Sequence, residues 1–122
     1  MKVILLLVTL FLFNFTNAQE QQEIYYNYAK GNIKESGEMD KNGYPIGEWK
    51  YHAENGALNY VINWDTNFIK MYYPTGELKQ KGTFIPDTGT HIGEWNTYYK
   101  NGKIKTQEVF DENGIKKQVE KN

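Results

Sequence analysis

Residues 93–105 read GEWNTYYKNGKIK, and residues 47–58 read GEWKYHAENGAL. Both stretches lead from a tryptophan to an Asn-Gly pair and then to an aliphatic residue, with apolar or aromatic side chains at alternate positions. A period of two is the spacing of a β-strand, and Asn-Gly between two such runs is typical of a hairpin turn. Each stretch therefore predicts a β-hairpin with a two-residue turn that accepts positive φ.

The same pattern occurs four times, each time centred on a turn glycine. Ile or Trp stands seven residues before each glycine, Ile or Leu two residues after it, and Met, Trp or Phe eight residues after it. Tandem units of this kind predict a repeat protein. We expect an all-β fold, an elongated antiparallel meander of about nine strands with no helix after the N-terminal leader. The hairpins centre on Gly31, Gly56, Gly76 and Gly102, with a partial unit at Gly114.

The alternation also assigns side chains to the two faces of this sheet. It predicts that Trp49, Trp64 and Trp95 share one apolar face, while the other face is mostly polar. The apolar face would measure roughly 900 Å², which is more than a soluble monomer usually leaves exposed. We expect the sheet to curl and cover this face itself. The functional alternative is that a partner, a second copy or a flat ligand covers it.

The N-terminus has the layout of a secretory signal peptide. Lys2 precedes an apolar run over residues 3–13, and small residues end at Ala18. The run is shorter than the roughly 20 residues that a membrane-spanning helix needs. We predict a signal helix over residues 1–18 that is cleaved near Ala18, and a β domain over residues 19–122. The protein would be periplasmic or secreted, with membrane contact only through an uncleaved leader.

The charged residues argue against several classes of partner. All 14 basic residues are lysine, so no side chain offers the planar bidentate recognition of phosphate that arginine provides. The leader contains one lysine and no acid, so the formal charge of the remaining chain is −2. We therefore expect no nucleic-acid partner.

The sequence offers little that points to catalysis or to a cofactor. Glu48 and Glu94 occupy the same position in two units, and paired carboxylates could serve a glycosidase, but the repeat itself explains their recurrence. His52 and His91 lack a metal-ligand spacing, and there is no cysteine to assist them. Ser36 follows no nucleophile pattern. We predict a non-enzymatic protein without catalytic residues, metal or cofactor.

Three of the units resemble the variant MORN repeat, which typically runs G-x-W-x-x-Y-Y-x-N-G-x-L-K-x-x-G. They are residues 47–58, residues 93–105 and residues 72–82, which read YYPTGELKQKG and lack the leading Gly-x-Trp. The resemblance extends over residues 24–115. The family includes the YwqK-type antitoxins and many small exported proteins. The resemblance therefore implies an elongated repeat sheet that binds a partner and does not catalyse a reaction.

These features predict an exported module for protein–protein binding, with an immunity role of the antitoxin kind implied by the resemblance. The partner would be a toxin or a component of the cell envelope. The alternative is an envelope-associated module that binds glycan or lipid through rows of aromatic side chains. Outward tyrosines are good contact residues, because tyrosine buries a large area at low entropic cost. The tryptophans either belong to this surface or pack in the core. The candidate binding surface comprises Tyr25, Tyr72, Tyr98, Trp49 and Trp95.

Overall fold

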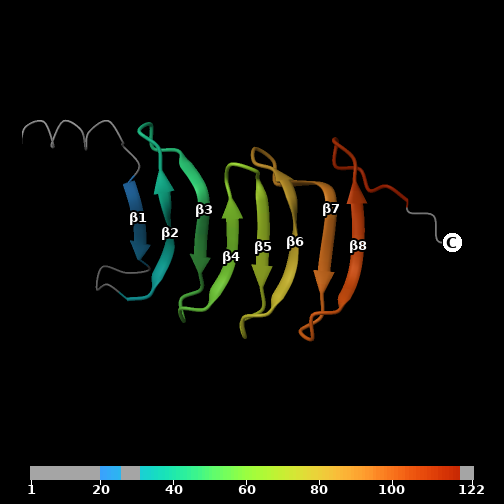
Figure 1. Cartoon of the computed structure of the whole chain (residues 1–122), viewed down its shortest axis with the longest axis horizontal. Coiled ribbons are helices and arrows are strands. Elements are labelled where there is room, and N and C mark those ends of the chain that lie inside the picture. The colour runs from blue at the N-terminus through green and yellow to red at the C-terminus, as the bar shows by residue number, and fades with distance from the viewer. Residues whose placement is uncertain (1–19, 26–30, 119–122) are drawn as a thin grey trace, which may run out of the picture.

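The computed structural model describes residues 20–25 and 31–118, which form one sheet of eight antiparallel strands. The order of the strands in the sheet follows their order in the chain (Figure 1). The predicted all-β meander is thus confirmed, whereas the predicted signal helix and its cleavage site lie outside the described residues. The strands are β1 (Glu20–Tyr25), β2 (Ile33–Met39), β3 (Pro45–His52), β4 (Leu58–Asn63), β5 (Phe68–Tyr72), β6 (Leu78–Ile85), β7 (Thr90–Tyr98) and β8 (Ile104–Phe110).

The sheet is a single open layer. Each strand contacts only its neighbours in sequence, and β1 and β8 lie at opposite ends of the row (Figure 1). The expectation that the sheet covers its own apolar face is therefore wrong. Closure requires tilted strands whose register staggers steadily around a barrel, whereas the short turns here place each strand beside the preceding one.

The predicted ninth strand is reduced to one bridge in the described part of the chain. Lys116 pairs with Phe110, and the Lys117 amide donates to the carbonyl of Val109 over 2.7 Å. The chain therefore starts a fifth hairpin after Gly114, and this short segment covers one end of the β8 edge.

The turns at Gly56, Gly76 and Gly102 each contain three residues, so the two-residue form predicted for the Asn-Gly turns is wrong. At the Gly56 turn, the Gly56 amide donates to the Ala53 carbonyl over 2.9 Å, and the Ala53 amide donates to the Ala57 carbonyl over 2.8 Å. Gly56 has a φ of 91°, but Asn55 does not have positive φ. The Asn55 side chain instead accepts a hydrogen bond from the Ala57 amide. Asn55 thus stabilises the turn through its side chain while its own φ stays negative. Gly56 is the residue of this turn with the left-handed backbone conformation.

A β-bulge explains the Gly-Glu-Trp motif. Ser36 pairs with Lys50 and Glu38 pairs with Ile46, so three residues of β3 lie opposite Gly37 alone. The bulge begins at Gly47, whose φ is 61°. An extra residue on one strand re-aims the side chains next to it.

The bulge directs Trp49 onto the neighbouring strand. Its indole lies over Gly37, where a Cβ would overlap the ring, and its Nε1 donates to the Glu38 carbonyl over 2.9 Å. Trp95 lies over Gly82 in the same way and donates to the Thr83 carbonyl over 2.8 Å. The two indoles are 2% and 4% exposed, and they form the core together with Ile62.

Candidate binding face

The three tryptophans share one face of the sheet, as predicted. Trp49 pairs with Ile62 on β4, and Trp64 follows directly after the end of that strand, where its Nε1 donates to the Tyr51 hydroxyl over 3.2 Å. Ring contacts continue this surface from Trp64 to Phe84 and from His91 to Trp95. We call this surface, from Trp49 on β3 to Trp95 on β7, the aromatic face.

A hollow of about 310 Å³ lies in the middle of the aromatic face, and we call it the central hollow. Its position follows from the direction in which the two tryptophans lean. Trp49 leans over β2, away from the centre, whereas Trp95 leans over β6, toward the centre. Ile62 and Ile69 lie between the two indoles and line the floor of the hollow. The lining residues are Tyr60, Ile62, Ile69, Met71, Phe84, Gly89, His91 and Trp95.

Polar residues bound the aromatic face at both ends of the sheet. On β1 and β2, Gln22 pairs with Gly37, and Glu35 lies between Tyr51 and Ile24 at the edge of the sheet. On β8 the rows through Thr97 and Trp95 end in Thr106 and Glu108. Polar side chains thus flank the middle of the apolar surface at both ends of the sheet, and a polar margin of this kind is common in protein–protein interfaces.

The predicted site tryptophans cannot present their rings to a ligand. Both faces of the Trp95 ring are occupied, because Gly82 lies beneath it and His91 stacks on it with centroids 3.5 Å apart. Trp49 is also buried. Both residues therefore act as packing residues that shape the aromatic face.

The predicted site tyrosines lie on the opposite face and do not come together. Tyr25 is on β1, where its hydroxyl donates to Glu23, and this bond raises the tyrosine pKa. Tyr72 is on β5, four strands away, which corresponds to about 19 Å. Tyr98 is on β7, where the Lys81 ammonium lies 5.9 Å from the centre of its ring. These three side chains do not form one site.

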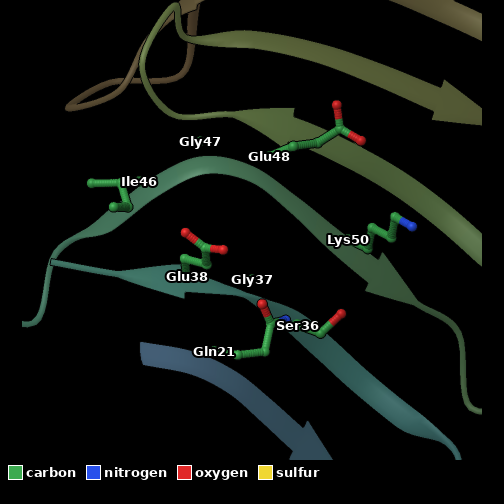
Figure 2. Close-up of a pocket in the computed structure, with 8 residues that line it drawn as sticks. All are labelled: Gln21, Ser36, Gly37, Glu38, Ile46, Gly47, Glu48 and Lys50. Carbon is green, nitrogen blue, oxygen red and sulfur yellow. The ribbon is translucent and has the colours of Figure 1, made fainter. Parts of the chain in front are cut away.

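A second hollow, of about 360 Å³, lies under the first bulge, and we call it the bulge hollow (Figure 2). Figure 2 shows β3 arching away from β2 around Gly47, with the side chains of Glu38, Glu48 and Lys50 at its margin. It is polar and shallow. The full lining is Gln21, Ser36, Gly37, Glu38, Ile46, Gly47, Glu48 and Lys50.

The recurring glutamates are too far apart to act as a catalytic pair. Glu48 is on β3 and Glu94 is on β7, so about 19 Å separates their strands. Glycosidases need carboxyl groups about 5–9.5 Å apart. Glu94 accepts hydrogen bonds from Asn96 over 3.1 Å and from Gln107 over 2.6 Å, which hold its pKa below the ordinary value.

Across residues 20–25 and 31–118, no three histidine or carboxylate side chains lie close enough to hold a metal ion. The same residues include no helix long and apolar enough to cross a membrane.

Residues 69–85 and 92–112 match the family model of the MORN repeat variant. These two segments are therefore similar to the MORN repeat variant. The matched segments contain most of β5 and β7 and all of β6 and β8. MORN repeats commonly serve as modules that bind proteins or membranes, and the family is generally non-enzymatic. No curated protein and no solved structure matches the chain.

The contact between tryptophan and glycine in the matched segments also recurs outside them. Trp49 and Gly37 in the first half of the chain repeat the contact that Trp95 and Gly82 make in the second half. The final glycine of the repeat pattern thus has a defined role, because it leaves room for the tryptophan of the next strand.

The central hollow itself was not predicted from the sequence. The hollow depends on the direction in which each indole leans, which the alternation of apolar residues does not specify. A signal was present in the sequence, since glycine stands six residues after Gly31 and Gly76, whereas isoleucine stands six residues after Gly56. The absence of a glycine there means that no tryptophan is accommodated over β4.

Proposed function

We propose that this chain is a protein-binding module that docks its partner on the aromatic face. The observation that carries the proposal is the central hollow, which is lined by aliphatic and aromatic side chains and which no other described element covers. Its volume falls within the roughly 300–1,000 Å³ that is usual for binding pockets. A bulky apolar side chain of the partner would enter the hollow.

The rim supports the same function. Binding energy concentrates in a few anchor residues that are enclosed by contacts which exclude water. Here Ile69 and Met71 would contact the anchor side chain of the partner. Polar residues at the two ends of the sheet, such as Gln22 on β1 and Thr106 on β8, would surround this contact and exclude water from it. An interface over most of the aromatic face would approach the roughly 800 Å² per partner of a stable complex.

We further propose that the chain acts outside the cytoplasm, on the basis of the leader layout. The resemblance to antitoxins makes a toxin of the envelope or the medium the first partner to test. Mass spectrometry of the protein purified from its own cells tests the export step, because a mature chain should begin at Gln19. Recovery of only the chain beginning at Met1 would contradict this proposal.

Substitution of Ile69 tests the binding face. Ile69 lines the central hollow and is half-buried. Partners would be captured by crosslinking, purified and titrated by calorimetry against the wild type, Ile69→Lys, Ile69→Ala and Lys103→Gln. We expect Ile69→Lys to weaken binding more than about tenfold and Ile69→Ala about fivefold, as for anchor contacts. Lys103→Gln, on the exposed Gly102 turn, should bind like the wild type.

The alanine variant retains an apolar side chain and serves in case the lysine variant fails to fold, which circular dichroism would reveal. Unchanged affinity in both folded variants would contradict the proposal. Saturable quenching of tryptophan fluorescence by a soluble polysaccharide, lost in Ile69→Ala, would replace the protein partner with a glycan.

A further inference from the structure

A row of lysines crosses the middle of the face opposite the aromatic face. The register pairs each residue of this row directly with the next, from β1 to β8, and the single carboxylate in it is Glu23 at the β1 end. We call its three cations, Lys50, Lys70 and Lys81, the lysine row. The complete series is Glu23, Ser36, Lys50, Val61, Lys70, Lys81, Asn96 and Gln107.

The arrangement is unfavourable for the isolated sheet. Lys70 lies directly opposite Lys81, and like charges in this position destabilise a strand pair. The one ion pair among the described residues joins Lys116 to Glu108, so none of the three lysines forms one, although Lys81 interacts electrostatically with the Glu94 carboxylate. Local arrangements that cost stability without a compensating contact are expected at functional positions.

Apolar and aromatic groups flank these charges. Val61 lies between Lys50 and Lys70 and is only 8% exposed, which is consistent with coverage by the lysine stems. Lys50 and Lys70 are exposed, and Lys81 is half-buried. Tyr72 lies two residues after Lys70 on the same strand, and the ring of Tyr98 lies near Lys81. The surface thus combines accessible positive charge with tyrosine rings.

We propose that the lysine row binds an acidic segment of a protein. The row spans three strand spacings, about 14 Å, which an extended peptide of four or five residues would cover. Lysine is a point charge that suits single carboxylates, and the chain contains no arginine for bidentate contacts to phosphate. A carboxylate between Lys70 and Lys81 would remove their repulsion. This surface lies on the other side of the sheet from the central hollow, so it does not depend on docking at the aromatic face.

The test uses the purified protein and a fluorescein-labelled peptide of ten glutamates, with binding measured by fluorescence polarisation. The variants are Lys70→Gln and Lys70→Gln/Lys81→Gln. The control Lys41→Gln/Lys103→Gln removes the same charge from exposed turns outside the row. We expect a loss of about two- to fivefold for each lysine of the row, with little change in the control, and weaker binding at higher salt.

Thermal unfolding provides the second measurement. Because Lys70→Gln removes a like-charge pair, it should raise the melting temperature by about 1–4 °C while it weakens peptide binding. If Lys70 instead served only to stabilise the fold, Lys70→Gln would lower the melting temperature. Equal losses in the control variant, or a lower melting temperature for Lys70→Gln, would overturn the proposal. It would also be overturned if the wild type did not bind the peptide but bound vesicles of phosphatidylglycerol and phosphatidylcholine.

Discussion

The two halves of the sheet, β1–β4 and β5–β8, contain the same backbone device with different side chains around it. The bulge glycines Gly47 and Gly93 have φ values of 61° and 67°. The indole Nε1 atoms of Trp49 and Trp95 donate to carbonyls of the preceding strand over 2.9 and 2.8 Å. The bulge, the tryptophan and the glycine beneath it are therefore the constant part of the repeat.

The surroundings of the two indoles differ. His91 stacks on Trp95 with an interplanar angle of 12°, whereas Trp49 contacts Tyr51 in a tilted arrangement with centroids 6.4 Å apart. Tyr51 stacks on Tyr60 instead, and burial raises the pKa of its hydroxyl. The second half thus holds its tryptophan on both sides and forms the wall of the central hollow. The constant bulge, tryptophan and glycine hold the sheet together, while the variable neighbours shape the proposed binding face.

The largest difference between the halves is expected from alanine at the glycines beneath the tryptophans. A Cβ at Gly82 or Gly37 would overlap the indole, and overpacking of a core typically costs about 1–3 kcal/mol, sometimes more. Gly82→Ala should cost more than Gly37→Ala, because the stacked His91 prevents Trp95 from lifting. Urea unfolding followed by tryptophan fluorescence measures both free energies.

A double-mutant cycle with His91→Ala sharpens this prediction. If His91 holds the indole down, the cost of Gly82→Ala should fall in the His91→Ala background by more than about 0.5 kcal/mol, the usual limit of additivity for independent sites. Gly37→Ala should be insensitive to the same background. Additive effects at Gly82, or equal costs at the two glycines, would remove the distinction between the halves.

The sequence predicted the strands and their faces better than the details of the connections. Turn glycines such as Gly56 and Gly102 and the alternation around them were enough to assign the meander, because both depend on local backbone preferences. The turn length was missed, since the Asn55 side chain binds the Ala57 amide and thereby favours a three-residue turn. The open sheet and the central hollow depend on long-range packing, such as the lean of Trp95 over Gly82, which periodicity does not encode.

Alanine at the bulge glycines should affect the halves equally. Gly47 and Gly93 have similar positive φ, and a left-handed conformation costs an L-residue about 1–2 kcal/mol. A Cβ at either position meets no neighbouring atom within 4 Å, so the cost is purely conformational. Gly47→Ala and Gly93→Ala should therefore lower the free energy of unfolding by the same amount within about 0.5 kcal/mol. Unequal costs in urea unfolding would mean that the bulges differ in more than their side-chain surroundings.

The smallest effect should appear at Glu94, as a dependence of stability on pH. Hydrogen bonds from Asn96, and next from Gln107, hold the pKa of Glu94 below its ordinary value of 4.5. A carboxylate whose folded-state pKa is lowered contributes stability above the unfolded-state pKa and loses it as the pH falls through the folded-state value.

The melting temperature of Glu94→Gln should therefore lie on the order of 1–2 °C below that of the wild type at pH 6, and the difference should vanish toward pH 3. Asn96→Ala/Gln107→Ala removes both donors, so the wild-type carboxylate in that background should lose its contribution at a higher pH. Thermal unfolding by circular dichroism between pH 3 and 7 measures these curves. Glu48→Gln makes the same change of charge in the first half, where Lys50 replaces the amide of Asn96. The prediction fails if the melting temperature of Glu48→Gln depends on pH in the same way, or if that of Glu94→Gln follows the wild type at every pH. Either result would mean that the amides of Asn96 and Gln107 do not make the second half different.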